Sequence, residues 1–127
     1  MSCFWIKAAG FLGALGVCLG AFAAHALREK LPPDLLVIFE TGVRYHLFHT
    51  LALLGVAILS FRFSDIRLLH WSAGFLTVGV LIFSGSLYIL ALSGVRMWGA
   101  VTPFGGVALI IGWICLGLSG RTMGRKS

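Results

Sequence analysis

The stretch FETGVRYHLFHTLALLG, Phe39–Gly55, places an acid, an arginine, a tyrosine and two histidines directly before an apolar segment. That apolar segment extends from about Tyr45 to Phe61. A helix that crosses a bilayer needs about 20 mainly apolar residues, with a range of about 17–25. The stretch therefore predicts a membrane-spanning helix with polar groups gathered at its entrance.

Three further apolar segments surround this one, at about residues 8–27, 68–92 and 100–118. Hydrophobic residues make up 59% of the chain and charged residues 11%, where soluble domains carry about 25% charged residues. A chain of 127 residues has no soluble core large enough to bury so much apolar surface. The sequence predicts an all-α integral membrane protein, a single membrane domain over 1–127 with four transmembrane helices in a bundle.

The net charge of +6 comes from basic residues that lie between the apolar segments, which is typical of membrane proteins and gives no nucleic-acid-binding stripe. With four spans, the termini and the 62–69 loop share one side, where basic residues exceed acidic ones by five; on the other side the excess is one. The positive-inside rule predicts that both termini face the cytoplasm. The expected location is a bacterial inner membrane, or alternatively the mitochondrial inner membrane with the termini in the matrix.

The first and last segments are rich in small residues. Small side chains at every fourth position let helix backbones approach closely in lipid. The glycines expected to pack helices in this way are Gly13, Gly16, Gly20, Gly105 and Gly106. The sequence AFAAHA, 21–26, also resembles a signal-peptide cleavage site, but the single Lys before the segment and its many glycines favour a retained helix.

The connection over residues 28–43 has a pattern of its own. Pro32 and Pro33 interrupt the first helix, and the following apolar residues Leu35, Leu36, Ile38 and Phe39 fall on one side of a helix. This pattern predicts a short interfacial helix between the first and second spans, lying in the membrane surface. Gly42 is expected to let the chain turn into the second span.

Polar residues from different spans are expected to share one layer in the outer half of the bundle. At about 1.5 Å per residue, His25 and His46 lie about 3 Å inside the outer boundary, and His49 lies one helical turn deeper. The members of this candidate polar layer are His25, Glu40, Arg44, Tyr45, His46, His49, Ser84, Tyr88 and Thr102. Within it, Glu40 and Arg44 have the i, i+4 spacing of a helical ion pair.

Several interpretations of this layer remain open. The polar groups can form a structural hydrogen-bond network, because polar side chains at membrane depth find partners inside the bundle. They can bind a small apolar ligand such as a lipid or a quinone. His25, His46 and His49 can also ligate a metal or a haem in a redox protein. A small permease is a further alternative, although all four carboxylates lie outside the spans.

Four stretches resemble, in order, the signatures of the YgdD-like family of small membrane proteins. They are GAFAAHAL (20–27), FETGVRYHLFHTLALL (39–54), FSGSLYILAL (83–92) and TPFGGVALIIGW (102–113). The resemblance covers nearly the whole chain and departs mildly at Ala23, where the family often has glycine. It implies four spans, a retained first helix and residence in bacterial inner membranes, with mitochondrial relatives. It implies no activity or cofactor.

Taken together, the residues predict a binding or assembly role, with no catalytic residue assigned. The expected partners are the lipid bilayer, a second copy of the chain or another membrane protein, and a lipid or quinone; nucleic acid is not expected. The redox and permease alternatives make different predictions, namely a bound metal and a solute flux.

Overall fold

The computed structural model describes residues 2–126 and is almost entirely helical in that range. Four helical stretches are long and apolar enough to cross a membrane, at Ser2–Lys30, Pro33–Arg62, Arg67–Ser93 and Arg96–Gly124. The elements are α1 (Ser2–Phe22), the π-helix η1 (Ala23–Leu27), α2 (Arg28–Lys30), α3 (Pro33–Arg62), α4 (Arg67–Ser93), the 3₁₀-helix η2 (Arg96–Ala100) and α5 (Thr102–Gly124). This confirms the prediction of an all-α protein with four spans.

The helix ends follow local backbone chemistry. Pro33 occupies the first turn of α3, where its missing N–H costs no hydrogen bond. Gly94 ends α4 in the left-handed region at φ +71°, and its N–H donates to the Leu90 carbonyl. Pro103 occupies the first turn of α5. These residues mark the start of α3, the end of α4 and the start of α5.

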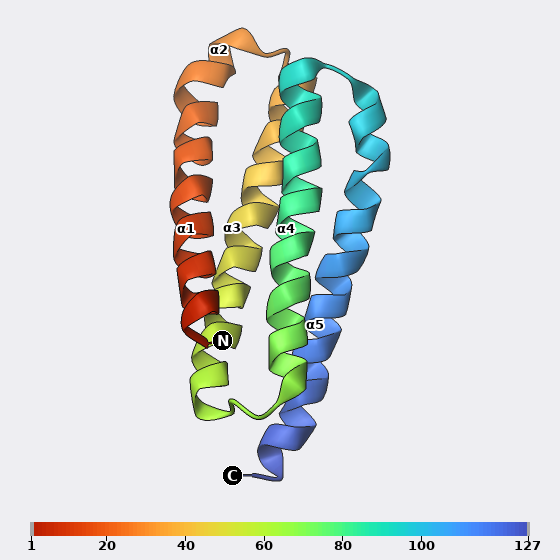
Figure 1. The fold of residues 1–127 in the computed structure, drawn as a ribbon. Coiled ribbons are helices and arrows are strands. Elements are labelled where there is room, and N and C mark those ends of the chain that lie inside the picture. The colour runs from red at the N-terminus through yellow and green to blue at the C-terminus, as the bar shows by residue number, and fades with distance from the viewer. Residues whose placement is uncertain (1, 127) are drawn as a thin grey trace.

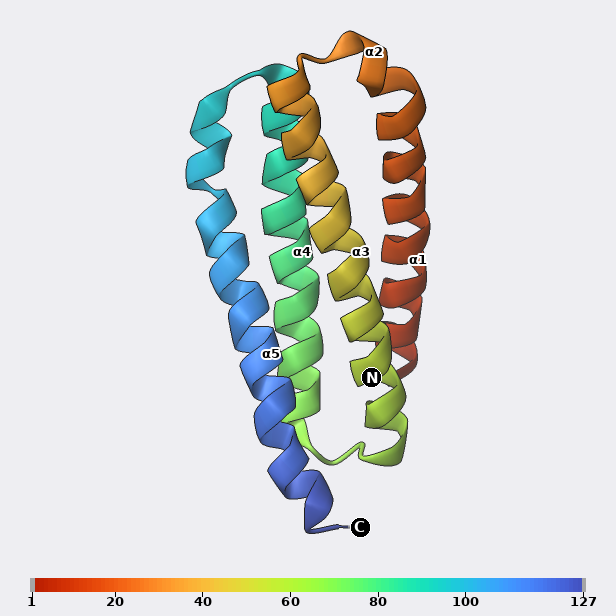
Figure 2. The same cartoon turned by 180° about the vertical axis from the view of Figure 1, so that it is seen from behind.

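The four long helices run up and down, and each packs mainly on its neighbour in the chain (Figures 1 and 2). α3 and α4 form the centre, whereas α1 and α5 stand on opposite sides. Ser2 contacts Ser60 and Lys126 contacts Asp65, so both lie at the end of the helices where Figure 1 marks the two termini, called here the terminal end. The other end, which carries the 28–34 and 94–101 connections, is called the loop end.

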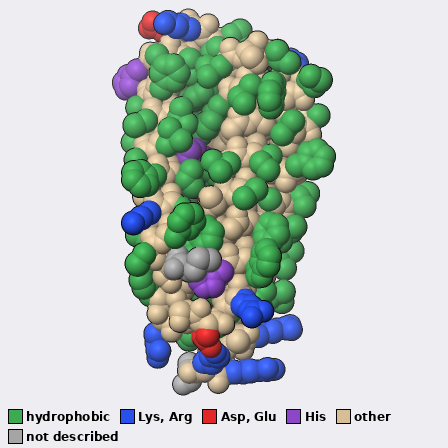
Figure 3. Space-filling model, in the orientation of Figure 1, with side chains coloured by type: hydrophobic (Ala, Val, Ile, Leu, Met, Phe, Trp, Pro, Cys, Tyr) green, Lys and Arg blue, Asp and Glu red, His purple; other side chains and the backbone are tan. Residues whose placement is uncertain are grey.

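Large apolar side chains cover the outside of the molecule. Figure 3 shows a surface dominated by hydrophobic side chains between two ends that carry charged groups. Phe11, Phe48 and Phe104 are each more than 60% exposed. Such a surface is stable in hydrocarbon and not in water, so the protein is an integral membrane protein in contact with lipid.

The prediction of a separate interfacial helix is wrong. Residues 33–62 form one continuous α3, so the segment after Pro33 is the first part of the second span. Gly42 does not turn the chain. It lies buried inside α3, where an added Cβ would come within 2.9 Å of the Tyr88 ring, so the glycine serves a close helix contact.

Glycines also set the distance between the other helices. Gly16 faces Leu47 of α3, and Gly20 faces Val43. A Cβ added at Gly16 would lie 2.7 Å from the Leu47 side chain, and one added at Gly20 would lie 3.3 Å from the Val43 side chain. Gly105 is tighter still, because its Cβ would lie 2.7 Å from the Phe83 Cα of α4. Gly13 and Gly106 have ordinary van der Waals space around them. Two more close contacts, at Gly79 and Gly112, join α4 to α5.

Candidate functional site

His46 lies buried where α1, α3 and α4 meet, with 2% of its surface exposed. Its Nε2 is 2.7 Å from the Leu12 carbonyl oxygen of α1, and its Nδ1 is 2.9 Å from the Tyr88 hydroxyl of α4. A carbonyl oxygen only accepts, so Nε2 carries the proton and donates. In the neutral imidazole Nδ1 then accepts from Tyr88, and the ring links three helices.

Further hydrogen bonds extend this linkage. The Ser84 hydroxyl donates to the Gly42 carbonyl over 2.7 Å, and the Thr50 hydroxyl donates to the His46 carbonyl over 2.7 Å. We call His46, Tyr88, Ser84 and Thr50 the polar seam. Gly16 makes the seam possible, because a Cβ there would lie 3.2 Å from the His46 ring.

The buried polar groups of the polar seam all have hydrogen-bond partners within the protein. Both ring nitrogens of His46 have protein partners, and no buried side-chain nitrogen or oxygen in residues 2–126 lacks one. A buried polar group with all its hydrogen bonds made stabilises one packing arrangement. The geometry therefore favours the structural interpretation for His46, Tyr88 and Ser84.

A second group of polar and aromatic side chains lies on α3 and α5. It lines a groove of about 480 Å³ between α3 and α5, open along the side of the bundle. We call this the lateral groove, and its lining residues are Arg44, Tyr45, Phe48, His49 and Trp113. The Tyr45 and His49 rings stack with centroids 5.7 Å apart and an interplanar angle of 11°, while Trp113 meets His49 edge-on at 5.9 Å.

His49 differs from His46 because only one of its two ring nitrogens has a hydrogen-bond partner in the part of the chain that the structure describes. Its Nδ1 is 2.8 Å from the Tyr45 carbonyl oxygen, so Nδ1 carries the proton and donates. In the neutral ring, Nε2 is then an acceptor, and it has no partner among residues 2–126. The same holds for the Arg44 guanidinium and the Trp113 indole N–H within that range. The lateral groove is thus lined by the acceptor nitrogen of His49, the Tyr45 hydroxyl, and the N–H donors of Arg44 and Trp113.

The lateral groove lies well inside the membrane-spanning part of α3. Gly20 of α1 lies opposite Val43, the residue before Arg44. Arg28 follows Gly20 by eight residues along the first helical stretch. At about 1.5 Å per residue, Arg44 lies about 12 Å closer to the membrane centre than Arg28. Ionisable groups at membrane depth are rare, and they mark ligand or ion sites in many membrane proteins.

Two predicted members of the polar layer are placed elsewhere. His25 is exposed on η1, away from His46, which lies opposite Gly16. Nine residues separate Gly16 from His25, so the two histidines differ in depth by about 13 Å. The equal depth expected for His25 and His46 is therefore wrong, because the span containing His46 begins earlier than predicted. Glu40 is exposed and forms no ion pair with Arg44.

Thr102 belongs to a separate contact. Its hydroxyl lies 2.6 Å from that of Ser86, a residue that the sequence did not single out. The three histidines do not converge, and within residues 2–126 no group of three His, Cys, Asp or Glu side chains is placed to hold a metal ion. Among these residues the metal interpretation therefore has no set of three ligands, and the haem interpretation stays a prediction.

Sequence reasoning missed two components of these sites. Trp113 is the last residue of the motif TPFGGVALIIGW, and no pattern marks it as part of a site. Its ring contact with His49 depends on how α5 packs on α4. The Leu12 carbonyl carries no side-chain signal at all. The small residue Gly16, four positions after Leu12, is the one sequence feature near this acceptor.

Comparison with known proteins gives a consistent result. Residues 19–106 match the family described as "Protein of unknown function (DUF423)". The UPF0382 membrane protein YwdK of Bacillus subtilis (strain 168) is 45% identical over 102 residues, covering 80% of this chain and 83% of that protein. The UPF0382 inner membrane protein YgdD of Escherichia coli (strain K12) is 42% identical over 123 residues, covering 97% and 93%. No solved structure matches.

Proposed function

Because this chain belongs to the DUF423 family, which confirms the resemblance to YgdD-like proteins, we propose that it acts in the membrane by binding rather than by catalysis. The ligand we propose is a membrane-dissolved quinol held in the lateral groove. One observation carries this proposal. His49 presents an open acceptor nitrogen between stacked and edge-on aromatic rings, in a groove that opens sideways from the bundle.

The chemistry of the groove selects the class of ligand. Aromatic walls favour a planar head group, since rings in offset or edge-on contact gain about 0.5–1.5 kcal/mol beyond area burial. The open Nε2 of His49 accepts a hydrogen bond, so it pairs with a hydroxyl rather than with a carbonyl. Arg44 supplies donors for the second oxygen of the head group. A hydroquinone ring offers both features, and an apolar tail can leave through the open side of the groove.

Binding is tested by titrating the detergent-purified protein with a short-chain ubiquinol, its quinone and its dimethyl ether. We expect the quinol to bind about tenfold more tightly than the dimethyl ether, which cannot donate to His49; one hydrogen bond of about 1.4 kcal/mol gives this factor. His49→Leu should remove the preference. Ile58→Ala, another exposed position on α3, should leave it unchanged. Equal binding of all three compounds to the native protein would contradict the quinol assignment.

We further propose that the protein lies in the bacterial inner membrane with both termini in the cytoplasm. The basic residues of the terminal end and the inner membrane location stated in the name of the E. coli relative support this orientation. In a variant whose three native cysteines are replaced by serine, Lys30→Cys should react with a membrane-impermeant maleimide in intact E. coli cells. Arg125→Cys should react only after the cells are opened. The reverse labelling pattern would contradict the orientation.

A further inference from the structure

A second site is visible on the outer face of α4, at the terminal end and on a different surface from the lateral groove. Two adjoining grooves of about 340 and 240 Å³ share Trp71 and Gly74. Together they are lined by Arg67, His70, Trp71, Gly74, Phe75 and Val78. These positions follow the spacing i, i+3, i+4, i+7, i+8 and i+11, which is one face of a helix. We call this face the α4 strip.

The α4 strip has the length and polarity of one leaflet. From Arg67 to Val78 the helix rises about 16 Å, half of the hydrocarbon thickness of about 30 Å. The cationic end of the strip is the end nearest the termini, and its deeper part is apolar. Gly74 keeps the middle open, because the nearest atom to an added Cβ is a Trp5 ring carbon 3.9 Å away.

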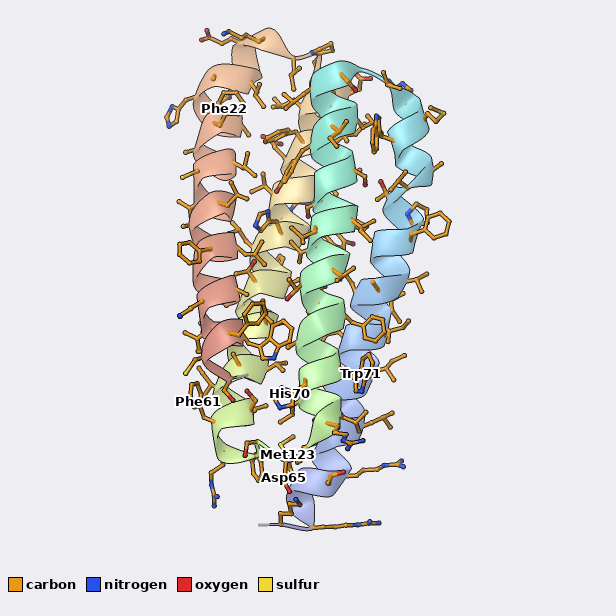
Figure 4. The ribbon with its side chains drawn as sticks, viewed as in Figure 1. Phe22, Phe61, Asp65, His70, Trp71 and Met123 are labelled. Carbon is orange, nitrogen blue, oxygen red and sulfur yellow. The ribbon has the colours of Figure 1, made fainter. Side chains whose placement is uncertain are left out.

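Two hydrogen bonds fix the His70 ring at the end of the strip that carries Arg67. The Trp5 indole N–H donates to His70 Nδ1 over 3.3 Å, and His70 Nε2–H donates to the Ser64 carbonyl over 3.2 Å. Figure 4 shows His70 and Trp71 flanking α4 near the terminal end. Asp65, the one acidic side chain at this end among residues 2–126, is paired with Lys126. Its negative charge is therefore balanced, and Arg67 is left with no ion-pair partner among residues 2–126.

We propose that the α4 strip binds an anionic phospholipid. Arg67 would meet the phosphate group, and one acyl chain would lie along Trp71, Gly74 and Val78. Charge complementarity carries this choice of lipid, since basic pockets at helix surfaces bind acidic head groups and each Lys or Arg near the surface contributes about 1 kcal/mol. A zwitterionic phospholipid has the same chains but no net charge for Arg67.

Native mass spectrometry of the delipidated full-length protein tests the site, with phosphatidylglycerol, phosphatidylcholine and glycerol 3-phosphate as the three probes. We expect phosphatidylglycerol to bind about fivefold more tightly than phosphatidylcholine, and glycerol 3-phosphate to compete weakly because it has no chains. Arg67→Gln should remove the fivefold preference. Arg62→Gln, a change at another exposed arginine of the same end that does not line the strip, should retain it.

Gly74→Leu separates the chain contact from the charge contact. The space around Gly74 admits a side chain, so this variant should fold, as judged by an unchanged far-ultraviolet spectrum and melting temperature without lipid. It should bind both phospholipids several-fold more weakly, because leucine fills the middle of the strip. Native-like phosphatidylglycerol preference in Arg67→Gln, or native-like binding in Gly74→Leu, would overturn the proposal. So would competition by glycerol 3-phosphate as strong as that of the intact lipid, since it would point to a free phosphate site.

Discussion

Gly105→Ala is expected to destabilise the protein by about 3 kcal/mol, the upper part of the range for an overpacked core. The added Cβ would lie 2.7 Å from the Phe83 Cα and 2.8 Å from its Cβ. Backbone atoms cannot rotate away as the end of a flexible side chain can, so α4 and α5 would have to separate. Their separation would also loosen the contacts at Gly79 and Gly112, which face Leu109 and Leu76.

The measurement is thermal unfolding in detergent, followed by helical circular dichroism. Gly117→Ala is the matched control on the same helix, because no atom beyond its own local helix backbone and chain neighbours lies within 4 Å of its added Cβ. This control should be neutral or stabilising, since alanine is favoured over glycine in a helix by up to about 1 kcal/mol. Equal melting temperatures for the two variants would show that α4 and α5 do not approach at Gly105.

His46→Ala is expected to cost about 3 kcal/mol as well. The change removes hydrogen bonds to the Leu12 carbonyl and the Tyr88 hydroxyl, each worth about 1 kcal/mol, and leaves a cavity between three helices. It also removes His46 as a hydrogen-bond partner of the Tyr88 hydroxyl. Tyr88→Phe should cost less, about 1–2 kcal/mol, because it leaves one acceptor of His46 unpaired and keeps the ring packed.

Chemical or thermal unfolding of the His46→Ala, Tyr88→Phe and double variants checks this linkage. If the two side chains act through their hydrogen bond, the double variant should be more stable than the sum of the single effects predicts. Strict additivity would contradict the linkage. If His46→Ala were as stable as the native protein, the polar seam would not be the element that joins α1, α3 and α4.

The sequence predicted the spans because hydrophobic length is a local property. Each of the four apolar segments lies within one long helical stretch of the structure. The error concerned the start of α3. Two prolines and a glycine suggested a break on each side of residues 34–41, whereas Pro33 only begins the helix and Gly42 makes room for Tyr88. Whether a glycine turns the chain or admits a neighbour depends on the packing partner, which lies 46 positions away.

The sequence also placed His46 and His49 together in one polar layer. The structure separates them, since His46 is buried against α1 and α4 while His49 reaches toward Trp113 of α5. A rotation of α3 by a fraction of a turn would exchange their surroundings, and no pattern within one helix fixes that rotation. It is set by Gly16 on α1 and by Tyr88 on α4, contacts that only the fold reveals.

His46 links α1, α3 and α4 through its hydrogen bonds, and we propose that His49 binds the ligand in the lateral groove. The most direct test measures the melting temperature and the quinol affinity of His46→Ala and His49→Ala in the same detergent. We predict that His49→Ala binds quinol about tenfold more weakly with a nearly unchanged melting temperature. His46→Ala should melt about 10 °C lower and, while folded, bind quinol normally. Native quinol affinity in His49→Ala, or lost affinity in His46→Ala at an unchanged melting temperature, would contradict the division between the two histidines.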